Sequence, residues 1–268
     1  MRGDFGRSWV NQTDVADDLL VRVPATLELM VLGLLLVFVV MVPLALATAT
    51  RGTGPLRRVL RKVSFGYSML AGALPDFWLG LVLVFLFFTQ AGWFPGPEGR
   101  LGITETPPEF VTGAYTVDAL LAGDLSTFWS ALTHLALPVV TLAFVYGGPV
   151  FKMTQSTVGA ALRSEYTVYA ESFGVPRWKI FAYAVRNAAP PVVVVTGVIV
   201  GYLLGGAVLI ESVFNLNGVG QYAVQAITTN DYAPIQAFVL LAAFFTMLVY
   251  LAVDLVHFAV DPRVRTKG

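Results

Sequence analysis

Ionisable residues inside apolar stretches are the first candidates for chemistry in this sequence of 268 residues. Glu211, Asp76 and Asp254 lie within or beside such stretches, where a charged side chain is costly and often functional. Two carboxylates could form the acid pair of an intramembrane enzyme, but nothing in the sequence places Glu211 near Asp76. For Glu211 the alternatives are a group that lines or gates a pathway and, as we prefer, a carboxylate that simply reaches water.

Other catalytic or metal-binding groups are scarce. The chain has no cysteine and two histidines, His134 and His257, which are far apart in sequence and are expected to be packed or interfacial. It contains neither an HExxH zinc motif nor a GxxxxGK[ST] phosphate loop. The sequence therefore predicts no metal site, no cofactor and no hydrolysis of ATP by this chain.

Composition indicates that lipid is the solvent for most of the chain. Apolar residues make up 56% of it and charged residues 13%, with a mean hydropathy of +0.72, whereas soluble domains carry about 25% charged residues. Seventeen basic residues balance seventeen acidic ones, so the net charge points to no nucleic-acid partner. The expected fold class is all-α, a polytopic helical membrane protein.

Five stretches are long and apolar enough to cross a bilayer as helices. They are residues 26–49, 65–90, 132–151, 188–210 and 235–258. In the second stretch, Pro75 and Asp76 are expected to divide the helix into two halves, because proline removes a backbone donor.

The loops between these stretches differ in charge. Segments 51–62, 152–187 and 259–268 hold 13 of the 17 basic residues, and the positive side of a membrane protein is normally cytoplasmic. The sequence therefore predicts an external N-terminal segment (1–25), a transmembrane domain (26–258) and a cytoplasmic tail (259–268). The N-terminus would lie outside and the C-terminus inside.

One cytoplasmic stretch, YAESFGVPRWK at residues 169–179, is aromatic and of mixed charge. Apolar residues recur at helical spacing before and after it: Leu162, Tyr166, Tyr169, Ala170 and Phe173, then Trp178, Phe181, Ala182 and Val185. Gly174 can adopt the left-handed conformation that ends helices, and Pro176 suits the first turn of the next helix. The pattern predicts two short amphipathic helices hinged at Gly174. They would either lie on lipid headgroups or dock into a groove of a soluble partner.

The fourth apolar stretch carries a row of glycines. Gly197, Gly201 and Gly205 are four residues apart and Gly206 follows directly. Glycines at this spacing form a smooth helix face that another helix can approach closely. Tight packing is the favoured interpretation, and direct contact with a transported substrate is the alternative.

The segment EYTVYAESFGVPRWKIFAYAVRNAAPP resembles the cytoplasmic signature loop, or EAA loop, of ABC-importer permeases. Its landmarks in that family are a small residue, a glycine four residues later and a downstream Asn/Pro stretch, matched here by Ala170, Gly174, Asn187 and Pro190. Further blocks in the same order are similar to the dipeptide/oligopeptide-type permeases: GDFGRS, RVPATLEL, GYSMLAGALPDFWLGL, GYLLGGAVLIESVFNLNGVGQYAVQAITTNDYAPIQ and VDLVHFAVDPRVR. Together they cover most of the chain.

The resemblance implies an ABC type I importer permease fold that moves peptides or similar small solutes across the cell membrane. Its partners would be a second permease, in a heterodimer, two cytoplasmic ATPase subunits and an external solute-binding protein. A coupling loop at residues 160–187 would dock on an ATPase through Tyr166, Tyr169, Ala170, Glu171, Phe173, Gly174, Pro176 and Trp178. The alternative function is a stand-alone secondary transporter or channel, although such proteins tend to show internal repeats and none is visible here.

The chain departs from this subfamily in two places. Glu171 and Phe173 stand near Gly174, where relatives usually carry basic residues. Relatives also have a further span before the GDFGRS-like block, so we expect that the functional protein includes an upstream span in addition to the five predicted here.

Overall fold

The computed structural model describes residues 5–50 and 54–260. Within these residues the regular elements are helices, apart from one isolated bridge between Arg7 and Asp14. The chain forms two compact units, which are described separately. Unit 1 comprises Met1–Leu35, Leu74–Ala143 and Tyr202–Thr246; unit 2 comprises Leu36–Ala73, Phe144–Gly201 and Met247–Gly268.

Four helical stretches of the described chain are long and apolar enough to cross a membrane, and each contains one of the predicted spans. The first joins α1 (Val15–Leu36), a π-helical turn η1 (Val37–Met41) and α2 (Val42–Ala49). The others are α6 (Leu125–Ala161), α8 (Arg177–Phe214) and α10 (Tyr232–Val260). The π-helical turn lies directly before Pro43, whose missing N–H interrupts the regular hydrogen-bond ladder.

The remaining predicted span, residues 65–90, is divided as expected at Pro75. Helix α3 (Pro55–Leu70) ends before it, and α4 (Asp76–Leu83) with η2 (Val84–Gln90) follows it. The residue before a proline is driven out of the helical conformation, which explains the break. The apolar helix Asp76–Gln90 is shorter than the four long stretches, so the count of five spans and the orientation stay predictions.

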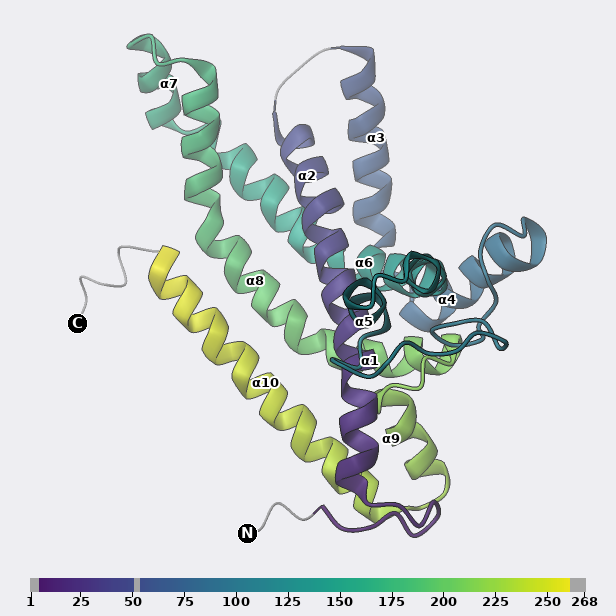
Figure 1. The fold of residues 1–268 in the computed structure, drawn as a ribbon. Coiled ribbons are helices and arrows are strands. Elements are labelled where there is room, and N and C mark those ends of the chain that lie inside the picture. Colours follow the sequence, from purple (N-terminus) through teal and green to yellow (C-terminus); the bar gives the residue numbers. More distant parts are fainter. Residues whose placement is uncertain (1–4, 51–53, 261–268) are drawn as a thin grey trace. The chain divides into compact units, whose positions relative to one another are not determined.

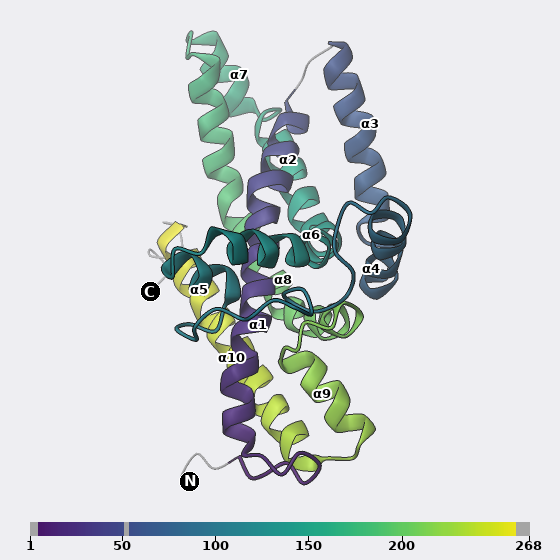
Figure 2. The ribbon, with the colours of Figure 1, turned by 45° about the vertical axis from the view of Figure 1, so that its right-hand side comes forward.

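Unit 1 contains the N-terminal part of the chain, α4, η2, α5 (Tyr115–Leu121) and α9 (Val219–Thr228) with parts of the long helices. The segment 1–25, predicted as an external tail, is helical from Val15 onward. Val15 and Leu19 pack against Val219, Tyr222 and Ala237. Both ribbon views show the N-terminal loop beside the start of α10 (Figures 1 and 2).

Unit 2 contains η1, α2, α3 and α7 (Glu165–Ser172) with parts of α6, α8 and α10. Its core is apolar: Tyr67 of α3 lies edge-on to Phe144 and Phe151 of α6, with ring centroids 5.1 Å apart in each pair. At Gly148, an added Cβ would lie 2.8 Å from the Cβ of Ala71, so glycine is what lets α3 and α6 approach here. A second cluster joins the end of α6 to the start of α8.

Candidate functional site

The predicted coupling segment is a helix, a tight turn and the start of a second helix, at the end of unit 2 where α6 is connected to α8 (Figures 1 and 2). Gly174 has φ +75°, the left-handed conformation expected from the sequence. The Val175 N–H donates to the Ala170 carbonyl over 3.0 Å, and the Gly174 N–H donates to the Glu171 carbonyl over 3.0 Å. These bonds satisfy carbonyls that would otherwise be unpaired at the end of α7.

Large aromatic side chains of this segment face solvent. Tyr169 is 69% exposed, Phe173 80% and Trp178 69%, and Tyr166 is also exposed. The rings of Tyr169 and Phe173 stack with centroids 6.2 Å apart. Glu171 and Pro176 are exposed as well, and Ala170 is half-buried. We call Tyr166, Tyr169, Phe173 and Trp178 the aromatic ridge; the unit that carries it leaves it uncovered.

Two details of the sequence prediction are wrong. The second helix is not short, because α8 continues without a break from Arg177 through Pro190 and Pro191 to Phe214. Proline already has a helical φ, and a helix of a membrane protein can tolerate the hydrogen bond that each proline removes. The first helix begins at Glu165, so Leu162 precedes it.

The buried face of early α8 also differs from the predicted stripe. Ile180, Ala184 and Ala188 are buried, whereas Trp178 and Ala182 are exposed. Ala184 and Ala188 belong to the cluster formed with Val158 and Ala161 of α6. Apolar residues lie on both faces of this turn of helix, so spacing alone could not tell which face packs within the chain.

The glycine row divides into packed and open positions. In unit 2, an added Cβ at Gly197 would overlap the side chain of Val253, and one at Gly201 would lie 3.5 Å from the Tyr250 hydroxyl oxygen. Tight packing therefore explains Gly197, whereas at Gly201 an added Cβ would make an ordinary contact. In unit 1, Gly205 is exposed and nothing lies within 4 Å of an added Cβ, whereas Gly206 is buried.

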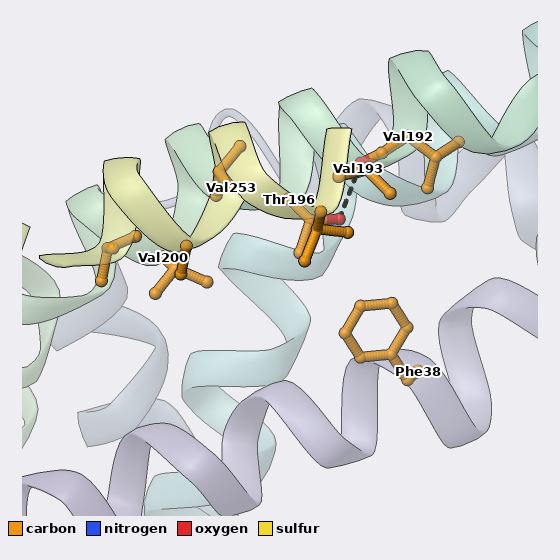
Figure 3. A pocket seen from close by; sticks show the side chains of 10 residues that line it. Phe38, Val192, Val193, Thr196, Val200 and Val253 are labelled. Carbon is orange, nitrogen blue, oxygen red and sulfur yellow. Dashed lines mark hydrogen bonds between the residues drawn. The ribbon is translucent and has the colours of Figure 1, made fainter. Parts of the chain in front are cut away.

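An apolar groove of about 310 Å³ runs beside Gly197 within unit 2 (Figure 3). Its lining residues are Phe38, Val192, Val193, Thr196, Gly197, Val200, Val249, Ala252, Val253 and Val256. The Thr196 hydroxyl donates to the Val192 carbonyl over 2.8 Å, as the dashed line shows. Since no ionisable side chain lines the groove, it offers apolar contact and no charge recognition.

In unit 1, Glu211 is completely buried, with 0% of its surface exposed. It accepts a hydrogen bond of 2.5 Å from the Thr26 hydroxyl and one of 3.0 Å from the Gln221 N–H. The Val219 N–H donates in turn to the Thr26 oxygen over 3.0 Å. The expectation that Glu211 reaches water is therefore wrong: the first turn of α9 lies over the carboxylate and supplies N–H groups that suit an anion.

Two glycines make this arrangement possible. An added Cβ at Gly218 would overlap the Glu211 carboxylate, and one at Gly220 would lie 2.5 Å from the Cα of Val208. The sequence analysis missed them. The signal was present, because two glycines in NGVG, shortly after the apolar run that ends at Glu211, are typical of a close backbone approach.

A second buried polar group in unit 1 was also missed. Glu28 of α1 accepts hydrogen bonds from the N–H and hydroxyl of Thr116, at 2.7 and 2.6 Å. Arg100 lies 3.5 Å from Glu28, donates to the Gly113 carbonyl over 2.8 Å and stacks over the ring of Tyr115. These contacts hold the long loop and α5 against α1. Glu28 was invisible in the sequence because it lies in an apolar helix with its partners about 70 and 90 residues away.

Asp118 of α5 organises the loop before it. Burial works to raise the pKa of Asp118, but donors outweigh it and lower the pKa: the hydroxyl and N–H of Thr112 and the N–H groups of Gly113 and Val111. Asp231, the residue directly before α10, accepts a 2.6 Å hydrogen bond from the Ser8 hydroxyl. Both carboxylates therefore act as acceptors that tie loops down.

The other candidate residues form no joint site. Asp76 is the half-buried first residue of α4, and Asp254 is exposed on α10. The carboxylate of Glu211 is held by Thr26 and Gln221, and the part of the chain that the structure describes contains no cluster of three His, Asp or Glu suited to a metal ion. The His134 ring nitrogen Nδ1 lies 2.8 Å from the Ser130 carbonyl oxygen, as a packed residue would.

Four long apolar helical stretches define a helical membrane protein. Residues 41–266 match the family described as binding-protein-dependent transport system inner membrane component. The chain belongs to this family, and it is a membrane permease subunit of an ABC importer. Membership implies ATPase and solute-binding-protein partners, and it does not favour a stand-alone transporter or channel.

Curated relatives are similar over the whole chain. Identity is 38% over 267 residues with the probable D,D-dipeptide transport system permease protein DdpB of Escherichia coli (strain K12), covering 99% of this chain and 77% of the relative. Identity is 34% over 267 residues with the di/tripeptide transport system permease protein DppB of Pseudomonas aeruginosa (strain UCBPP-PA14), covering 98% of this chain and 77% of the relative. Identity is 32% over 274 residues with the dipeptide transport system permease protein DppB of Escherichia coli (strain K12), covering 100% of this chain and 78% of the relative.

Proposed function

We propose that this permease carries dipeptides or similarly short peptides across the cell membrane. The observation that supports this substrate class is similarity over 98–100% of the chain to permeases named for D,D-dipeptides, di/tripeptides and dipeptides. The complete importer would contain a second, different permease, two cytoplasmic ATPase subunits and an external solute-binding protein. ATP hydrolysis takes place on the ATPase subunits in this proposal.

The aromatic ridge is the docking site for an ATPase subunit in the same proposal. Its support is physical: three of its rings are more than two-thirds exposed, and such a surface is costly to leave in water. Helix-in-groove contacts would cover Tyr169, Phe173 and Trp178. Gly174 sets the angle between α7 and the start of α8.

The proposed energy transfer is mechanical. When ATP closes the two ATPase subunits, the docked ridge moves with them as a rigid body. Within unit 2, α8 is unbroken from Arg177, next to the ridge, to Gly201. A displacement of the ridge is therefore carried along this part of the helix, and no chemical step on the permease is required.

Gly174→Val tests the docking role. A β-branched residue at φ +75° is strained by about 1–2 kcal/mol and would relax by changing the turn. The matched control is Gly123→Val, because Gly123 has φ +71° and is equally open but lies between α5 and α6. In the complete transporter, G174V should lose ATP-driven uptake and release the ATPase subunits, while G123V should retain both. Uptake and ATPase association in G174V equal to those in G123V would refute the docking role.

A second experiment tests the substrate class. Proteoliposomes that hold both permeases and the ATPase subunits, supplied with the cognate solute-binding protein, should accumulate a labelled dipeptide only when ATP is present. The control is the same proteoliposome preparation with ATPase subunits that cannot hydrolyse ATP. Accumulation of a sugar or a metal ion but not of any di- or tripeptide would contradict the peptide assignment and leave the docking proposal untouched.

A further inference from the structure

The first two turns of α3 form a surface that no described part of unit 2 covers. Residues 54–59 and 61–63 are exposed, whereas Ser64 and Tyr67, further along the helix, are buried. Packing inside the unit therefore holds only the second half of α3. The first half is folded as a regular helix (Figures 1 and 2), and most of its side chains are exposed.

This exposed half has two chemically distinct faces. Leu56, Val59 and Val63, at helical spacing, are 71%, 57% and 55% exposed and form an apolar face. Four basic residues lie on the opposite side of the same two turns: Arg57, Arg58, Arg61 and Lys62. Neither face has a structural function inside the unit, because neither is covered.

Three cations of the basic face carry charge that the described part of the chain does not neutralise. Residues 51–75 contain no Asp or Glu. Among the residues that the structure describes, none forms an ion pair with Arg58, Arg61 or Lys62. Arg57 donates to the Thr50 hydroxyl oxygen over 2.9 Å and is not counted among these three. The positive charge of Arg58, Arg61 and Lys62 is therefore available to an anionic partner.

We propose that the start of α3 is a binding site for anionic phospholipids. The phosphates of the headgroups would pair with Arg58, Arg61 and Lys62, and the acyl chains would cover Leu56, Val59 and Val63. Two observations favour a lipid over an acidic protein or free phosphate. The apolar face of the same two turns needs an apolar occupant, and free phosphate has no apolar group. In addition, α3 lies in the chain between the long membrane-crossing stretch Val15–Ala49 and the apolar helix Asp76–Gln90, so it is held at the bilayer.

Lipid titration of the purified complete transporter tests this inference. Bound phosphatidylglycerol and phosphatidylcholine are counted by native mass spectrometry, in the wild type and in Arg58→Gln/Arg61→Gln. The wild type should prefer phosphatidylglycerol, and the preference should weaken as ionic strength rises. In the variant, affinity for phosphatidylglycerol should fall by about thirtyfold, because each basic residue at an anionic surface contributes a factor of about five and two are removed. Binding of phosphatidylcholine should not change.

The matched control is Arg163→Gln/Arg186→Gln, which removes the same charge from two exposed positions outside α3. The inference is overturned if both double variants lower phosphatidylglycerol binding equally, because the effect would then be general surface charge. It is also overturned if inorganic phosphate competes as well as the lipid does, or if Arg58→Gln/Arg61→Gln leaves lipid binding intact and instead releases the ATPase subunits. Leu56→Ser/Val59→Ser should weaken lipid binding without changing its salt dependence; unchanged binding would remove the role of the apolar face.

Discussion

The two units bury different kinds of groups. All five buried acidic and basic residues of the described chain belong to unit 1: Glu28, Arg100, Asp118, Glu211 and Asp231. The buried polar residues of unit 2 are Ser64, Thr154 and Thr167. These three hydroxyls donate to carbonyls of the preceding turn or the nearby helix end, at 2.7, 2.8 and 2.8 Å, so unit 2 buries no charge among the described residues.

The difference has a physical consequence for how each unit holds its shape. Hydrogen bonds such as Thr26 to Glu211 and Ser8 to Asp231 join segments 185 and 223 residues apart and tolerate little displacement. Unit 2 relies on apolar contacts and glycines, which are less directional. Unit 1 therefore has the more rigidly specified interior.

Removing the Glu211 carboxylate should give the largest effect. Glu211→Ala leaves the Thr26 hydroxyl and the Gln221 N–H buried without an acceptor and creates a void, at a cost of about 3 kcal/mol or more. Glu171→Ala, at an exposed carboxylate, is the control and should change stability by less than about 0.5 kcal/mol. Apparent melting temperatures of the purified proteins measure both. Equal melting temperatures would mean that the buried network does not stabilise unit 1.

The apolar packing of unit 2 is tested at its glycines. Gly197→Ala inserts a methyl group into Val253 and should cost about 1–3 kcal/mol. Gly205→Ala makes the same change at an open helical position and should be neutral or stabilise by up to about 1 kcal/mol. Thermal unfolding of the pair distinguishes packing from a general intolerance of this helix to change. If both variants were equally destabilised, the packing interpretation of Gly197 would be wrong.

Asp118 gives a smaller and pH-dependent effect. Its pKa in the folded protein is lowered, so its stabilisation is present above the unfolded pKa of about 3.9 and is lost as pH falls through the folded value. Asp118→Asn should therefore be less stable than wild type at neutral pH, by about 1 kcal/mol. The difference should shrink as the pH is lowered below about 4. A difference that stays constant over this range, measured by melting temperature, would show that the charge of Asp118 contributes nothing.

The exposed ridge should give the smallest effect on stability. Phe173→Ala removes a ring that is 80% exposed and should change the melting temperature of the isolated permease little, by less than about 0.5 kcal/mol in free energy. Its effect belongs to assembly: binding of the ATPase subunits should weaken. Strong destabilisation of the isolated permease would instead show that the Phe173 ring stabilises unit 2 itself.

Local chemistry explains which features could be predicted. Pro75 interrupts its helix and Gly174 adopts φ +75° because each depends on the backbone limits of one residue. The long helices follow from uninterrupted apolar runs, so the all-α membrane fold was also predictable. The ordered blocks similar to peptide permeases led to the right family. Element ends were less predictable: the helix predicted to start at Pro176 and the span predicted at 188–210 form one helix, α8, because a helical φ at Pro190 lets the helix continue.

The burial of Glu211 could not be predicted, because it depends on partners that are distant in sequence. Spacing marked Glu211 as an ionisable residue at the end of an apolar run, and this pattern fits a carboxylate in water as well as one held by Thr26 and the first turn of α9. The same holds for early α8, where apolar residues on both faces left open which face is buried.

By itself, the sequence determined the lipid-compatible composition, the helices, the turn at Gly174 and the family, because each follows from local residue types or their order along the chain. Only the tertiary structure decided which glycines are filled by neighbours, which aromatic side chains stay uncovered and which carboxylates lie inside. The physical reason is that burial and hydrogen bonding are properties of pairs. Folding brings the partners of Glu211, Glu28 and Asp231 to them from distant parts of the sequence. Residue spacing within one segment therefore cannot predict these contacts.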